Sequence, residues 1–223
     1  MGLGDVVDYL LLKLEGGFGD GHARERRPRA RIREIRDGLV RVTGQVRCHG
    51  ELLRAPVSGR PCAAFHVLVE ERRSFRTQDN GWTVLLDLQD ARPFSVVDDS
   101  GQATVDTSGP MELALKGIRG PMRRPDPAKR AQLEGVKRLL ESRGFSTRTL
   151  LGLPRTLLYE ETIVAEGQKI SVDGLGIHEV ASDGERGGPR EPEHVVLRGT
   201  KEEPLLISDP SEVPDAARDR GVG

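Results

Sequence analysis

The sequence predicts a mainly β fold: an OB-like barrel or sandwich of about eight to ten strands, with one inserted α-helix at about residues 127–143 and an N-terminal amphipathic helix. Three observations lead to this prediction. Runs in which apolar and polar residues alternate recur along the chain. Turn-forming residues separate these runs. A helical period replaces the alternation near the N-terminus and in the inserted segment.

A hairpin is the centre of the predicted β fold. Residues 94–97 and 102–105 alternate apolar and polar side chains, as half-buried strands do. Residues 98–101, Asp-Asp-Ser-Gly, form the turn between them, because Gly101 can adopt a positive φ.

Further strands are predicted on both sides of the hairpin. Gly44 lies in the middle of the run 39–48, where it indicates a bulge or the sharp bend with which a small barrel turns a corner. Trp82 is interpreted as a core residue, with a partner anchor as the alternative. The other predicted strands cover residues 62–72, 82–88, 111–117, 157–164, 170–175, 195–197 and 205–208.

The inserted helix has clear end signals. Asp126 suits the N-cap position and Pro127 the first helical position. Gly144 stands where a helix C-terminus favours glycine. One apolar stripe joins Leu133, Val136 and Leu140.

The chain divides into four predicted parts. They are an N-terminal helix at residues 1–15, a basic linker at 16–29, a β domain with its helical insert at 30–208, and a disordered tail at 209–223. The N-terminal helix either packs on its own β domain or docks on a partner or a membrane surface. Its candidate contact residues share one helical face: Leu3, Val6, Val7, Leu10, Leu11 and Leu14.

The linker carries the densest positive charge in the sequence. Arg26, Arg27 and Arg29 are its candidate partner-binding residues, and a run of this kind can neutralise phosphates. No aromatic residue is interleaved to stack on bases, so binding of single-stranded nucleic acid on an OB-like face, with this arginine run, is the weaker hypothesis.

Composition excludes several classes of protein. The chain has 34 basic and 35 acidic residues, so its net charge of -1 gives no general attraction to nucleic acid or anionic lipid. Two cysteines do not make a disulfide framework. With no signal peptide recognised and no long apolar run, we expect a cytoplasmic protein, with peripheral membrane association as the alternative.

The order of the motifs resembles the GIDE-type domain, also called the BAM ("beside a membrane") domain, of the mitochondrial ubiquitin ligase activator family and its prokaryotic relatives. The central match is PFSVVDDSGQATVD at residues 93–106. The resemblance covers about residues 30–210, and its other segments are Trp82 and residues 32–46, 52–62, 159–174 and 196–209.

This resemblance implies a β domain that binds a protein or senses a membrane-proximal partner. Family members typically have flanking transmembrane helices, and the ligases among them a C-terminal RING, whose zinc needs Cys and His pairs. The sequence shows neither feature. Ubiquitin-ligase activity is therefore an alternative that rests on the family label only. We expect that this protein is not an enzyme.

Candidate chemical groups are few. Cys62 and His66 are four residues apart on one predicted strand and would face the same way, so with Cys48 they form a partial zinc site. A buried thiol and a hydrogen-bonded histidine are the favoured interpretation. The adjacent pair Glu160 and Glu161 would point to opposite faces of a strand, in solvated positions, and cannot act as a dyad. We expect no catalytic residue and no cofactor.

Overall fold

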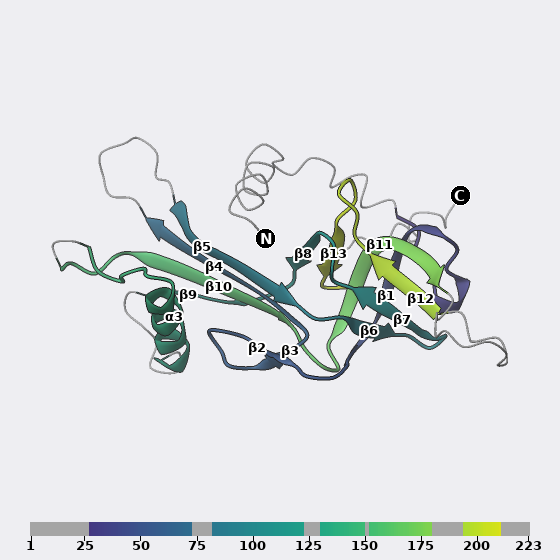
Figure 1. Ribbon diagram of the computed structural model, residues 1–223, viewed down its shortest axis with the longest axis horizontal. Coiled ribbons are helices and arrows are strands. Elements are labelled where there is room, and N and C mark those ends of the chain that lie inside the picture. Colours follow the sequence, from purple (N-terminus) through teal and green to yellow (C-terminus); the bar gives the residue numbers. More distant parts are fainter. Residues whose placement is uncertain (1–26, 73–81, 123–129, 150–151, 180–193, 211–223) are drawn as a thin grey trace, which may run out of the picture.

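A computed structural model describes residues 27–72, 82–122, 130–149, 152–179 and 194–210 of the chain (Figure 1). The predicted N-terminal helix with its stripe from Leu3 to Leu14 lies outside the described residues. Arg26, the proposed N-cap Asp126, the side chain of Trp82 and the tail beyond residue 210 also lie outside them.

A closed five-stranded barrel forms one half of the molecule, and the predicted mainly β fold with an OB-like barrel agrees with it. It closes because its first strand pairs with two neighbours, one on each side. In pairing order, its strands are β1 (Gly38–Cys48), β6 (Phe94–Val97), β7 (Gln102–Asp106), β12 (His194–Arg198) and β11 (Lys169–Glu179). The strands β13 (Leu205–Ser208) and β8 (Met111–Ala114) extend the sheet beyond β11.

Gly44 marks a corner of this barrel. Strand β1 pairs with β11 up to Gln45 and with β6 from Gln45 onward, so it changes partner next to Gly44. A Cβ atom at Gly44 would lie 2.4 Å from the carbonyl oxygen of Val97. Only glycine permits this approach of the two strands, which agrees with the predicted bend.

A second sheet stands apart from the barrel. Its strands, in pairing order, are β5 (Trp82–Ala91), β4 (Ala64–Arg72), β10 (Leu157–Val164) and β9 (Ile118–Pro121). Figure 1 shows β4, β5 and β10 as long ribbons that run away from the barrel. The predicted strand 82–88 and residues 64–72 of the predicted strand 62–72 therefore belong to this sheet, not to the barrel around the central hairpin.

The helix α3 (Arg130–Ser142) covers one face of the second sheet and gives it a core of its own. Val136 and Leu140 of the predicted stripe are buried there, and Leu133 is half-buried. A Cβ atom at Gly135 would lie 2.2 Å from the carbonyl oxygen of Val57, so the helix sits directly on the loop between β2 (Leu53–Arg54) and β3 (Pro61–Cys62). Gly144 has a φ of 78°, as predicted for the residue after the helix.

The hairpin turn is fixed by the carboxylate of Asp98. Its Oδ1 accepts hydrogen bonds from the amides of Ser100 and Gly101, at 2.7 and 2.9 Å. Its Oδ2 accepts one from the amide of Ile32 at 2.9 Å, at the start of the short helix η1 (Ile32–Glu34). Burial alone would raise the pKa of Asp98, but a hydrogen bond from the Ser100 hydroxyl at 2.6 Å and these amide hydrogen bonds outweigh burial and hold the pKa below its usual value.

Candidate functional site

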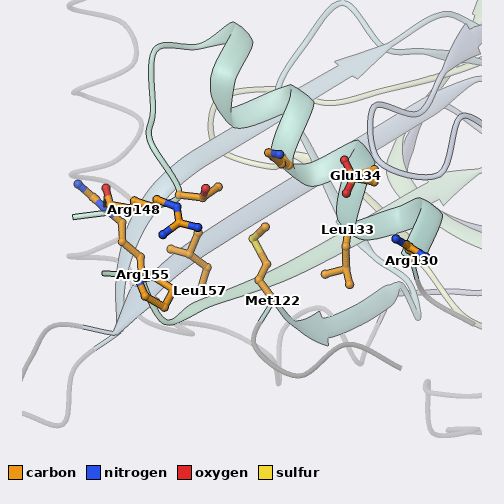
Figure 2. Close-up of a pocket in the computed structure, with 10 residues that line it drawn as sticks. Met122, Arg130, Leu133, Glu134, Arg148, Arg155 and Leu157 are labelled. Carbon is orange, nitrogen blue, oxygen red and sulfur yellow. Dashed lines mark hydrogen bonds between the residues drawn. The ribbon is translucent and has the colours of Figure 1, made fainter. Parts of the chain in front are cut away.

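A surface cavity of about 310 Å³ lies between α3, residues 147–148 and 154–155, and the second sheet. Its floor is apolar and consists of Met122, Leu133 and Leu157, while Pro154, which also lines it, is exposed. Figure 2 shows Met122 between Leu133 of the helix and Leu157 of the sheet. Leu133 and Met122 are half-buried and pack against the core cluster that contains Leu157, the first residue of β10.

Positive charge dominates the rim of this cavity. Among the described residues that line it, Arg130, Lys137, Arg148 and Arg155 are cationic and Glu134 alone carries a carboxylate. Figure 2 places Arg130 at one end of the apolar row and Arg148 and Arg155 at the other. The cavity therefore offers cations at both ends of an apolar floor.

Hydrogen bonds hold the wall opposite the helix. Arg155 Nη1 donates to Glu71 Oε2 at 2.9 Å, and this pair neutralises the arginine's charge. Arg148 Nη1 donates to the carbonyl oxygen of Gly152 at 2.8 Å and keeps its charge. Within the described ranges, no carboxylate forms an ion pair with Arg130, Lys137 or Arg148. As far as the described residues go, these three cations therefore have no carboxylate that competes with an anionic ligand.

A Ser–His pair lies near the barrel, but its surroundings do not suit catalysis. His49 Nε2 is 2.6 Å from Ser95 Oγ, which also accepts a hydrogen bond from Gln102 Nε2 at 2.9 Å. Ser95 is fully buried in β6, and a nucleophilic hydroxyl must meet its substrate. This network joins β6 to its neighbours and stabilises the barrel.

The three candidate zinc ligands do not converge. Cys62 ends β3 and packs with Phe65 in the core under α3, whereas His66 points to the other face of β4 and lies 2.7 Å from Asp87 Oδ1. The expected common orientation of Cys62 and His66 is therefore wrong, because a break at residue 63 separates their strands. Over the described ranges, no three His, Cys, Asp or Glu residues are placed to hold a metal ion.

Both thiols are poor nucleophiles. Burial, followed by the charge of Glu161, raises the pKa of Cys62 to about 11. Burial and the neighbouring Glu166 raise the pKa of Cys48 to about 11 as well. Both cysteines are free thiols. At neutral pH they are protonated, and a protonated thiol does not attack a substrate.

The two adjacent glutamates have different roles. They do point to opposite faces, but only Glu160 is in a solvated position, 3.8 Å from Arg119 Nε. Glu161 is 1% exposed, and its carboxylate accepts hydrogen bonds from the amides of Val57 and Ser58 at 2.7 and 3.0 Å. The solvated position expected for Glu161 is wrong, because the tight turn at residues 55–59 needs a buried acceptor for its amides.

The predicted basic cluster does not form one exposed surface. Arg27 is buried and paired with Glu203, so its guanidinium is not on the surface offered to a partner. Arg29 is exposed. Arg41 exchanges backbone hydrogen bonds with Pro28 and Ala30, each 3.0 Å long. Residues 28 and 29, assigned from the sequence to the linker, therefore run along β1.

Sequence reasoning missed the cations of the cavity. Arg130 and Lys137 are seven residues apart, two helical turns, on the margin of the apolar stripe, and this spacing is the signal that could have found them. Arg148 and Arg155 carry no such signal, since only the fold brings them opposite α3.

The described part of the chain contains no helix long and apolar enough to span a membrane. Comparisons with known protein families, curated proteins and solved structures give no significant match.

Proposed function

We propose that this protein is a non-enzymatic interaction module, of the kind implied by its resemblance to the GIDE/BAM domain, and that it binds a protein partner at the cavity beside α3. The observation that carries the proposal is the apolar floor with cations at both ends. Apolar pockets with a few convergent charged groups are the usual form of a binding site. With two free thiols in the chain, we propose a cytoplasmic setting.

Binding fits the described residues better than catalysis does. The groups that resemble catalytic ones are engaged in structural contacts: Ser95 with His49, His66 with Asp87, and Glu161 with a loop. Ser95, His66 and Glu161 are buried or half-buried, and none of these groups lies in the lining of the cavity. The cavity itself presents cations and apolar carbon, which recognise a ligand without changing it.

The test is an affinity capture with matched charge reversals. The full chain is compared with Arg130→Glu/Lys137→Glu at the cavity and with Arg138→Glu/Arg143→Glu, which changes exposed cations on or just after the same helix outside the lining. We expect a partner that the first variant loses and the second retains. A partner retained by both variants, or none captured by the wild type, would overturn the proposal.

A further inference from the structure

We infer that the ligand of this cavity is an acidic peptide segment in an extended conformation, with one apolar anchor side chain between its acidic residues. The inference rests on the function proposed above and names the chemistry of the partner. It follows from three properties of the cavity: its size, the order of its charged and apolar groups, and its recessed floor.

The size limits what can enter. A volume of about 310 Å³ is at the lower end of the range for ligand pockets, about 300–1,000 Å³. One or two side chains fill such a space, whereas a helix or a long acyl chain does not fit in it. The part that enters must be apolar, because Met122, Leu133 and Leu157 form the floor.

The order of the groups sets the spacing of the ligand. Arg130 and Lys137 are separated by seven residues, which is about 10 Å along a helix axis. An extended chain advances by about 3.3 Å per residue, so about three residues cover this length. Acidic side chains one or two positions before and after the anchor would therefore meet the cations on the helix and Arg148 on the opposite wall.

The recessed floor and its composition disfavour other anions. Leu157 is 1% exposed and Met122 and Leu133 are half-buried, so the floor is recessed, whereas a lipid bilayer contacts protruding side chains. The described lining contains no aromatic ring, and single-stranded nucleic acid depends on such rings for stacking. An acidic peptide can place an apolar side chain on the floor and carboxylates beside the cations.

The probe is a fluorescein-labelled peptide, Gly-Glu-Asp-Leu-Asp-Glu-Gly, titrated with the full chain and followed by fluorescence anisotropy. We expect Arg130→Glu/Lys137→Glu to weaken binding by tenfold or more, and Arg138→Glu/Arg143→Glu to change it by less than about twofold. Replacing the peptide's leucine with alanine should weaken binding by about tenfold, since the apolar contact of the anchor is lost. Circular dichroism confirms that both variants fold.

Other outcomes would overturn the inference. One is equal affinity of the two variants for the peptide, and another is an affinity that does not change when the leucine is replaced with alanine. A third is no peptide binding while an oligothymidylate strand or phosphatidylserine vesicles bind at the cavity. Failure of the peptide does not by itself remove the proposed function. If the cavity variant still loses its captured partner, the module stands and only the acidic-peptide chemistry is wrong. If neither peptide nor partner responds to that variant, both proposals fail.

Discussion

Glu161 Oε1 accepts a hydrogen bond from the amide of Val57 across 2.7 Å in the interior of the protein. This contact ties β10 to the turn at residues 55–59, and the carbonyl oxygen of Val57 is the atom on which α3 rests at Gly135. One wall of the cavity thus depends on a buried carboxylate that does not itself line the cavity.

Replacing Glu161 with glutamine should destabilise the protein. The substitution removes the charge that accepts the amides of Val57 and Ser58, and it places an NH₂ group where an acceptor is needed. We expect the free energy of unfolding to fall by about 2 kcal/mol, measured by urea denaturation. Glu160→Gln is the matched control and should change it by less than about 0.5 kcal/mol, because its pair with Arg119 is exposed. Equal losses of stability in the two variants would contradict the role given to the buried Glu161 carboxylate.

Gly135→Ala should loosen the helix from the sheet. Alanine favours a helix over glycine by about 1 kcal/mol, but its Cβ would lie 2.2 Å from a backbone oxygen that cannot rotate away. We expect the free energy of unfolding to fall by about 1–3 kcal/mol, because the helix must move away from the loop. We also expect the cavity to bind its ligand more weakly. Glu141→Ala, at an exposed position of the same helix, should leave the stability within about 0.5 kcal/mol of wild type. A stabilised Gly135→Ala protein would show that propensity outweighs the contact.

Asp98→Asn should destabilise the barrel in a pH-dependent way. The carboxylate accepts several hydrogen bonds in the folded protein, and its pKa is lowered relative to the unfolded chain. Its contribution is therefore complete above the unfolded pKa, about 4, and is lost as the pH falls through the lower folded pKa. We expect wild type to exceed the variant by about 1–2 kcal/mol at pH 7, with the difference shrinking below pH 4. Equilibrium denaturation at pH 7, 4 and 3 measures it, and a constant difference would contradict the assignment.

The thiols should resist labelling in the folded protein. With a pKa of about 11, only about one Cys62 thiol in a thousand is ionised at pH 8. We expect negligible reaction with a disulfide reagent at pH 8 and reaction of both cysteines in urea. A Cys48→Ser variant reports on Cys62 alone. Rapid labelling of that variant without urea would reveal a local opening of the core under α3.

The sequence predicted those parts of the fold that depend on local pattern. The alternation around Asp98, the corner at Gly44 and the stripe that buries Val136 and Leu140 are all present in the structure. Each of these features follows from side-chain period or backbone freedom within a few residues.

The features that depend on pairing partners were not predictable. Alternation identifies 64–72 as a strand but does not reveal that it pairs with β10, some ninety residues later, in a second sheet. The burial of Glu161 depends on a turn about a hundred residues away. The same holds for the cavity, because only the tertiary fold sets Arg148 opposite Arg130.

The pairing order of the barrel also has a consequence for biosynthesis. Strand β12 fills the gap between β7 and β11, and it comes close to the end of the described chain. The strands β4, β5, β9 and β10 are all translated before β11 begins, so the second sheet can assemble on the ribosome while the barrel is still open. During that interval the edges of β1 and of the hairpin remain unpaired. Unpaired strand edges are prone to aggregation, so we expect the nascent chain to need a chaperone most at this stage.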